Sequence, residues 1–268
     1  MTHIEQDLDT EQRRDVIARE LAWHEEEAEK RHGLDHFLYA PPAFDNIVKN
    51  MLDFLDGSPG DVAVDMACGE GKETLSMAQR GWVVFSLDLS HAQLVRAREM
   101  IKKTDPDLRV HFIQANAEQM PFAGSSLQII YGKAIVHHLD LALSPREIDR
   151  VLKENGRATF AEPMAHHPLI WIGRHLTPKM RTVDEHPLTY SEFKGFLEKF
   201  EHGVIEENFL FALLAYVFRM TSKGEPLFRK THHLLSRFDS WLLRHFKFLK
   251  PLAWYDSVYV QKGQNYEF

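Results

Sequence analysis

The chain has 268 residues and a formal net charge of −7, with 44% hydrophobic and 26% charged residues. These proportions are those of an ordinary globular protein, so they exclude a collagen-like, low-complexity or fully disordered chain. The single cysteine, Cys68, excludes a disulfide framework and a cysteine-based zinc site. The length fits one large domain, or one domain with appendages.

The first residues are polar and acidic, which is not typical of a signal peptide. The longest strongly apolar stretch, residues 209–218, is much shorter than the roughly 20 residues that a membrane-spanning helix needs. We therefore predict a cytoplasmic protein. The acidic balance also argues against non-specific binding of nucleic acid, so we expect no nucleic-acid partner.

Residues 1–31 are dense in charge and contain neither proline nor glycine, which indicates an exposed or partly docked helix. A second helical pattern follows the two prolines at 41 and 42, with apolar residues at helical spacing from Phe44 to Leu55. We predict that residues 1–59 form an N-terminal helical arm.

Residues 60–163 alternate between short apolar runs and amphipathic segments. The apolar runs predict strands at 61–67, 82–88, 109–115, 127–134 and 157–163. Helices are expected at 73–80, from Ser90 to about residue 101, and from Ser144 to the Asn155-Gly156 pair. Ser90 with Gln93, and Ser144 with Glu147, have the spacing of capping boxes. This alternation predicts a parallel sheet with helices on both faces.

The rest of the chain has a different pattern. Residues 164–188 have no clear period, and we expect them to form a lid segment over a substrate pocket. In residues 189–268, Thr189 and Glu192 have capping-box spacing before a helix, and strands are expected from 203 and at 252–262. Between these strands, about 212–250, we predict a helical insertion.

A glycine-containing turn follows the first strand, as Cys68-Gly69-Glu70-Gly71. Such a turn lets a ligand approach the backbone at the start of a helix. Asp88 ends the second strand about 20 residues further on, where a carboxylate can accept hydrogen bonds from both ribose hydroxyls. These two features indicate a nucleotide-like ligand at the carboxyl edge of the sheet.

Five segments, in order, resemble the motifs of class I S-adenosylmethionine (SAM)-dependent methyltransferases, in particular small-molecule methyltransferases of the type 11 kind. They are 65–71 (DMACGEG), 87–90 (LDLS), 114–122 (QANAEQMPF), 126–139 (SLQIIYGKAIVHHL) and 151–163 (VLKENGRATFAEP). The resemblance implies a Rossmann-like seven-stranded α/β sheet, mostly parallel with the last strand antiparallel. It also implies helices on both faces, with the N-terminal arm and the lid as additions.

The resemblance further implies SAM as the cofactor and S-adenosylhomocysteine as its product. The implied cofactor-binding residues are Asp65, Ala67, Cys68, Gly69, Gly71, Asp88, Leu89, Asn116, Ala117 and Lys133. Ala67 stands where the family has its first glycine, so we expect no positive φ at this position. Asn116 replaces an aspartate, and its carbonyl oxygen can still accept from the adenine amino group.

Methyl transfer from a sulfonium is an in-line displacement in which positioning does most of the work. A base is needed only when the acceptor must lose a proton, and the candidates are His137, His138 and Glu162 at the carboxyl edge. Residues expected to contact the substrate are Tyr39, His166, His167, Trp171, Arg181 and His186. The aromatic and aliphatic residues after 163 favour a hydrophobic, aromatic or lipid-like small molecule as acceptor.

Two other functions remain open from the sequence. One is a non-catalytic SAM-binding protein. The other is an NAD(P)-dependent oxidoreductase, which is disfavoured because Thr74 follows where a third glycine is expected. We predict no metal, because adjacent histidines on an extended segment point to opposite sides and rarely supply two ligands.

The segment 228–250 reads as an amphipathic helix with basic residues around an apolar stripe. It suits weak contact with an anionic membrane surface, and the alternative is a helix packed on the sheet with its Arg and Lys side chains in solvent. The chain is expected to act as a monomer or homodimer.

Overall fold

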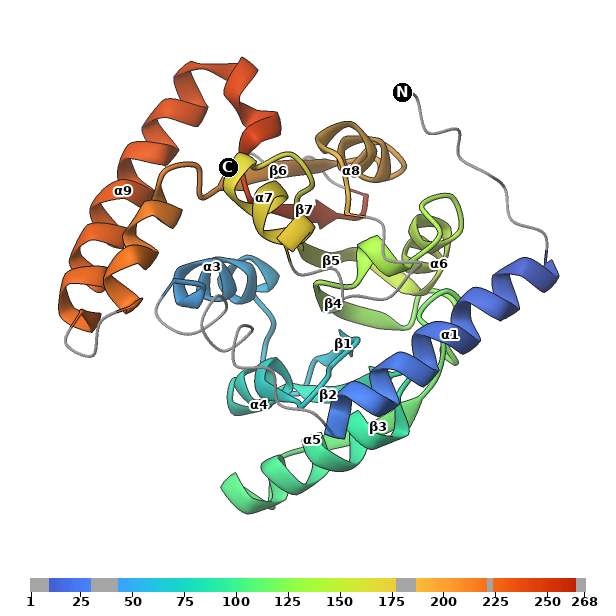
Figure 1. Ribbon diagram of the computed structural model, residues 1–268. Helices are drawn as coiled ribbons and strands as arrows, with labels where there is room; N and C mark the ends of the chain where they lie inside the picture. Colours follow the sequence, from blue (N-terminus) through green and yellow to red (C-terminus); the bar gives the residue numbers. More distant parts are fainter. Residues whose placement is uncertain (1–9, 30–42, 177–186, 221–223, 264–268) are drawn as a thin grey trace.

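The computed structural model describes residues 10–29, 43–176, 187–220 and 224–263. A single sheet runs through the middle of the molecule, with helices packed around it (Figure 1). Its strands are β1 (Val62–Met66), β2 (Val83–Asp88), β3 (Val110–Gln114), β4 (Leu127–Lys133), β5 (Leu152–Pro163), β6 (Gly203–Asn208) and β7 (Tyr255–Gln261). All five strands predicted before residue 163 are present.

The seven strands follow the order β3-β2-β1-β4-β5-β7-β6. Neighbouring strands from β3 to β5 are parallel, whereas β7 runs antiparallel to both β5 and β6. The predicted fold class is therefore confirmed. From β1 the next strands along the chain, β2 and β3, lie on one side, and from β4 the next strand, β5, lies on the other side. The strand order therefore reverses between β1 and β4. Ligands of open α/β sheets bind at this point, beyond the carboxyl ends of the strands.

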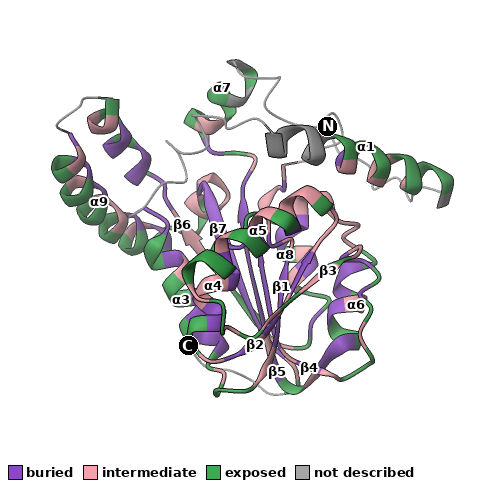
Figure 2. Ribbon diagram, turned by 90° about the horizontal axis from the view of Figure 1, so that it is seen from below, coloured by how far each residue is buried: buried purple, intermediate pink, exposed green. Residues whose placement is uncertain are grey.

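Successive side chains of the strands point to opposite faces of the sheet, and they form two apolar cores, one on each face. One core contains Ala63 and Tyr131 and is covered by α3 (Asp45–Leu55) and α4 (Lys72–Gln79). The other contains Val64 and Phe160 and is covered by α6 (Ser144–Val151) and α8 (Tyr190–Leu197). Helix α5 (His91–Thr104) packs Leu94 and Ala97 against Cys68 in a smaller cluster. Figure 2 shows the buried strands between these layers.

Helix α6 differs from the prediction at both ends. It ends at Val151 instead of reaching Asn155, which has a φ of 62° inside β5. Ser144 does not cap the helix, because its hydroxyl donates to the carbonyl of Asp140 at 2.6 Å. The predicted capping box of Thr189 and Glu192 is present at the start of α8.

The predicted insertion between the last two strands contains a 3₁₀ helix, η3 (Ala212–Met220), and the long helix α9 (Glu225–His245), followed by η4 (Lys247–Leu252). These elements pack on one another beside β6 (Figure 1). At the other side of the molecule lies α1 (Thr10–Glu29), which contacts α5. In the described part of the chain, no helix is both long and apolar enough to cross a membrane.

Candidate active site

A cavity opens at the carboxyl edge of the sheet, next to the reversal of strand order. Residues that follow β1, β2, β3 and β4 line it, and α1 contributes one wall. At the end of β2 these are Leu87 and Asp88; in the segments after the four strands they are Ala67, Gly69, Leu89, Gln93, Ala115, Asn116, Ala117, Glu118, Ala134, Ile135, His138 and Leu139; from α1 they are Arg13, Val16, Ile17 and Glu20. Six of the ten predicted cofactor residues thus lie around one cavity.

Asp88 and the glycine turn form a braced cradle. The Oδ2 atom of Asp88 accepts from the amide of Gly69 at 2.9 Å, and its Oδ1 atom accepts from the amide of Ser90 at 2.9 Å. Gly69 has a φ of +50°, and no heavy atom lies within 4 Å of the position that a Cβ would take there. Gly69 lines the cavity, and no side chain of its own or of a neighbour occupies the space at its Cβ position.

The prediction for Ala67 is wrong, because this residue has a φ of 59°. The turn keeps the left-handed backbone that a glycine would adopt without strain, and the alanine methyl group is tolerated at a cost. Gly71 has a different role from Gly69. A Cβ at Gly71 would lie 2.8 Å from the Cβ of Ala97, so this glycine allows α4 and α5 to pack closely instead of lining the cavity.

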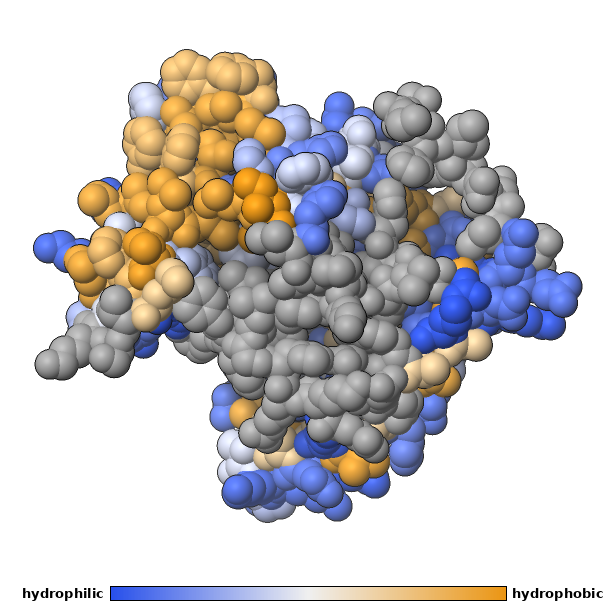
Figure 3. Space-filling view, in the orientation of Figure 1, coloured by the Kyte–Doolittle hydropathy of each residue, from blue (hydrophilic) through white to orange (hydrophobic). Residues whose placement is uncertain are grey.

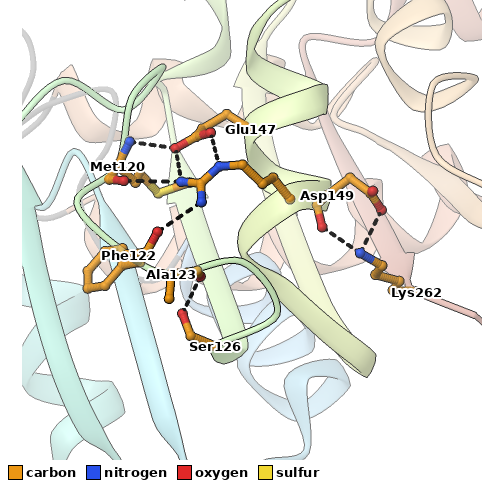
Figure 4. Close-up of polar contacts among 8 residues, drawn as sticks. Met120, Phe122, Ala123, Ser126, Glu147, Asp149 and Lys262 are labelled. Carbon is orange, nitrogen blue, oxygen red and sulfur yellow. Dashed lines mark hydrogen bonds and ion pairs between the residues drawn. The ribbon is translucent and has the colours of Figure 1, made fainter.

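The loop that carries Asn116 and Ala117 is held in place from both sides. The side-chain Oδ1 of Asn116 accepts from the amide of Glu118 at 2.9 Å. Further along, the Oε1 atom of Glu147 on α6 accepts from the amide of Met120 at 2.6 Å (Figure 4). Arg150 donates to the carbonyl of Phe122 at 2.9 Å and to Glu147. The loop is thus positioned by α6 before any ligand binds.

Helix α1 adds two polar contacts at the cavity that the sequence did not predict. Arg13 pairs with Glu118, with its Nε donating to Oε2 at 3.2 Å. The Oε2 atom of Glu20 lies 3.1 Å from Nδ1 of His138, and Glu20 is buried. The sequence of α1 has many charged and few apolar residues, so it does not show which acidic side chain is buried. The contact of Glu20 with His138 is seen only when α1 is packed against the rest of the protein.

His137 and Glu162 lie behind the cavity wall. Glu162 is fully buried, and its Oε1 atom accepts from the amides of Ile135 and Val136 at 2.8 Å each. Its Oε2 atom lies 2.6 Å from Nδ1 of His137. Glu162 therefore holds the turn after β4 that presents His138 to the cavity.

The expectation that the two histidines lie on an extended segment is wrong. Residues Val136–His138 form a 3₁₀ turn, and the rings of His137 and His138 lie 4.1 Å apart. The described residues hold no cluster of three or more His, Cys, Asp or Glu side chains suited to a metal ion.

Three other predicted cofactor residues, with Gly71, lie outside the cavity lining. Asp65 is buried and accepts from the hydroxyl of Thr74 at 2.5 Å. Desolvation raises the pKa of Asp65 to about 7, although the hydrogen bond from Thr74 opposes the shift. Lys133 pairs with Glu73. Cys68 packs in the small cluster with α5, and burial raises the pKa of its thiol.

Of the predicted substrate residues, the three that the structure describes are absent from the lining of this cavity. His167 is buried and its Nε2 lies 2.8 Å from the carbonyl oxygen of Leu210, while His166 and Trp171 are exposed. Trp171 lies on α7 (Pro168–Leu176), beyond the end of the strands (Figure 2). Tyr39, Arg181 and His186 lie outside the described residues. The ends of the predicted lid segment meet, since the amide of Ala165 donates to the carbonyl of Leu188 at 2.8 Å.

The strand order, the antiparallel β7 and the cradle at the glycine turn define the class I SAM-dependent methyltransferase fold. Comparison with known proteins agrees, because residues 64–160 match a family model described as a methyltransferase domain. Residues 64–160 are therefore similar to a methyltransferase domain, within a sheet of the class I SAM-dependent methyltransferase fold.

Curated relatives align with part of the chain. Methyltransferase GfsG of Streptomyces halstedii is 30% identical over 122 residues, which are 45% of this chain and 44% of the relative. The 27-O-demethylrifamycin SV methyltransferase of Amycolatopsis mediterranei (strain S699) is 31% identical over 105 residues, 38% of this chain and 39% of the relative. In each case the chain spans less than half the length of the relative that it matches.

Solved structures align over a larger share. Geranyl diphosphate C-methyltransferase from Streptomyces coelicolor A3(2) has a TM-score of 0.59 at 16% identity, covering 81% of this chain and 79% of the other. A phosphoethanolamine N-methyltransferase of Haemonchus contortus has a TM-score of 0.60 at 19% identity, covering 82% of this chain and 53% of the other. At these identities, the similarity is one of fold.

Proposed function

We propose that the chain binds SAM in this cavity and transfers its methyl group to a small hydrophobic acceptor. The observation that carries the proposal is the cradle, in which an open Gly69 lies beside the carboxylate of Asp88 at the end of β2. When bound, SAM supplies an electrophilic methyl group on a sulfonium. The domain match and the naming of the relatives as methyltransferases support the proposal.

The residues present fit such a ligand. Each carboxylate oxygen of Asp88 accepts one backbone amide, and these bonds fix the orientation of the carboxylate that lines the cavity. A carboxylate in this position is the acceptor that ribose hydroxyls need. Leu89 offers an apolar surface for a flat ring, and the braced loop at Asn116 and Ala117 lies at the same cavity. We therefore assign these residues to the nucleoside part of SAM.

His138 is our candidate for the group that receives a proton from the acceptor. It lines the cavity, and the nearby carboxylate of Glu20 would stabilise the imidazolium that forms when the ring accepts a proton. We assign positioning roles to His137 and Glu162, since both lie behind the wall and Glu162 fixes the turn that carries His138.

The acceptor side of the cavity is apolar. Val16 and Ile17 of α1 line the cavity together with Ile135 and Leu139, and most of the lining surface is apolar. Apolar walls with a few polar groups select hydrophobic molecules and fix their orientation. Methyltransferases of similar sequence include two that are named for quinones, a demethylmenaquinone methyltransferase and a 2-phytyl-1,4-naphthoquinone methyltransferase.

Calorimetric titration with SAM and with S-adenosylhomocysteine tests the site. We expect micromolar binding of both, weakened at least tenfold, or about 1.4 kcal/mol, by Asp88→Ala. Asp107→Ala is the matched control, because Asp107 is exposed before β3 and is absent from the cavity lining. Equal affinities for Asp88→Ala and wild type, with both folded, would show that the site is assigned to the wrong residues.

Catalysis is tested by incubating the protein with SAM and a reduced demethylmenaquinone, geranyl diphosphate or phosphoethanolamine, and measuring S-adenosylhomocysteine. We expect turnover with the apolar quinol and none with phosphoethanolamine. Binding of SAM without turnover of any of the three would favour the non-catalytic alternative.

A further inference from the structure

An exposed apolar face lies on the outer side of α9. It comprises Phe211, Leu214 and Val217 around η3, Leu227, Leu234, Phe238 and Trp241 on α9, and Phe246 and Phe248 after it. Leu234 is 66% exposed and Phe248 is 75% exposed. Figure 3 shows orange side chains gathered over the part of the molecule where Figure 1 shows α9. We call this set the α9 apolar face.

The aromatic members of this face are in contact with one another. Ring centroids are 6.1 Å apart for Phe211 and Phe238, 6.0 Å for Phe238 and Trp241, and 6.1 Å for Trp241 and Phe246. A further 6.1 Å separates Phe246 from Phe248. The face is therefore continuous from η3 across α9 to η4.

The α9 apolar face is separate from the face by which α9 packs on the protein. Phe228, His232, Asp239 and Leu243 are buried on the opposite side of the helix. Asp239 accepts from the amides of Leu210, Phe211 and Ala212, and this fixes the start of η3 against α9. One side of α9 therefore packs on the protein, and the other exposes aromatic residues to solvent.

A row of cations borders the apolar face. Lys230, Arg237 and Arg244 are spaced by seven residues and are exposed, so they lie along one line of the helix beside Leu234 and Trp241. Of the acidic residues of α9, Asp239 is buried and Glu225 contacts Arg219 and Arg229. Among the described residues, no ion pair is formed by the three cations of this row.

We propose that the α9 apolar face docks on the surface of an anionic lipid bilayer. Trp and Phe side chains would enter the boundary between head groups and acyl chains, and the row of cations would lie at the level of the lipid phosphates. The charges favour this occupant over a second copy of the chain. An isologous dimer through this face would bring two identical basic rows together and add no exposed acid to pair with them.

This proposal is independent of the proposed catalytic function, and it is tested without turnover. The full chain is sedimented with vesicles of phosphatidylcholine, with or without phosphatidylglycerol, at low and at high salt. We expect binding only to the vesicles that contain phosphatidylglycerol, and at least a fivefold weaker partition at high salt, because the Debye length shortens.

Two double variants separate the apolar and the ionic contributions. We expect Phe238→Ser with Trp241→Ser, and Arg237→Glu with Arg244→Glu, each to lower the bound fraction at least fivefold. The matched controls are Val95→Ser, an exposed apolar residue of α5, and Lys102→Glu with Lys103→Glu at its end, all of which should bind like wild type. Thermal melting verifies that each variant is folded.

Three results would overturn the proposal. The first is wild-type protein that stays in the supernatant with anionic vesicles at low salt. The second is vesicle binding by the folded face variants that equals that of wild type. The third is a dimer detected by light scattering without vesicles that Phe238→Ser with Trp241→Ser converts to a monomer, which would assign this face to self-association.

Discussion

At both the cavity edge and the α9 region, carboxylates hold the backbone by accepting its amides, but the surfaces of the two regions differ. At the cavity, Asp88 and Glu162 each accept two backbone amides and so hold turns that face a hollow. At α9, Asp239 accepts three amides and holds η3, but the surface that results is exposed and aromatic. The same kind of carboxylate–amide bonding therefore occurs beside a cavity and beside an exposed surface. The side chains carried by the fixed backbone determine which of the two surfaces is formed.

The largest expected effect concerns the ionisation of Asp65 beneath the cavity. Its folded-state pKa of about 7 exceeds the unfolded value of 3.8, so between these pH values the folded protein holds a proton that the unfolded chain has lost. Stability should therefore fall as pH rises from about 4 to 7, by on the order of 4 kcal/mol, and become flat above that. Asp65→Asn should remove this part of the pH dependence in urea unfolding.

Asp107→Asn, which changes an exposed acid, serves as the control for this comparison. Other buried acids with a raised pKa, such as Asp256, contribute equally to the pH dependence of stability in wild type and in both variants. Stability curves for wild type and Asp65→Asn that run parallel from pH 4 to 8 would contradict the prediction.

The next effect concerns the α9 region. Asp239→Ala leaves three backbone amides at the start of η3 without their carboxylate, and we expect a loss of about 3 kcal/mol in unfolding free energy. Asp239→Asn keeps one acceptor oxygen and should lose less. Chemical denaturation measures both variants. SAM affinity at the distant cavity should be unchanged in the folded protein, and a parallel loss of SAM affinity would show that the two regions are coupled.

At the cavity, His138→Ala should lower turnover of an acceptor that loses a proton by about 100-fold, or about 2.7 kcal/mol, because the proton then has no positioned acceptor. SAM affinity should stay within a factor of about three. Glu20→Gln should lower turnover less, because the histidine stays in place and only the carboxylate that stabilises the imidazolium is gone. His175→Ala, an exposed histidine of α7, is the control. Full activity in His138→Ala would exclude the histidine as the base.

The smallest effect tests the strain in the glycine turn. Ala67→Gly replaces an alanine held at φ 59° by a residue that adopts this conformation freely, so we expect a gain of about 0.5–1 kcal/mol. Ala63→Gly, within β1, should instead lose stability and serves as the opposite control. Equal melting temperatures for Ala67→Gly and wild type would mean that the turn carries no measurable strain.

The order of the strands along the chain and six of the cavity residues could be predicted because they depend on local signals. Strand ends, a glycine turn and an acid at fixed spacing all lie close together in sequence. Gly71 and Lys133 were also singled out by these signals, but they contact Ala97 and Glu73 instead of the cavity. Their side-chain partners lie 26 and 60 positions away, and a sequence pattern contains no information on such contacts.

The sequence by itself determined the α/β class, the parallel core and the place of the cavity, because periodicity and turn residues act over a few neighbours. Only the tertiary structure decided that Glu20 approaches His138, that Ala67 takes a left-handed backbone, and that α9 turns one apolar side inward and another outward. These outcomes depend on which elements pack against each other. An apolar stripe in the sequence predicts that a helix has an apolar face. It does not show whether that face packs on the rest of the protein or is exposed.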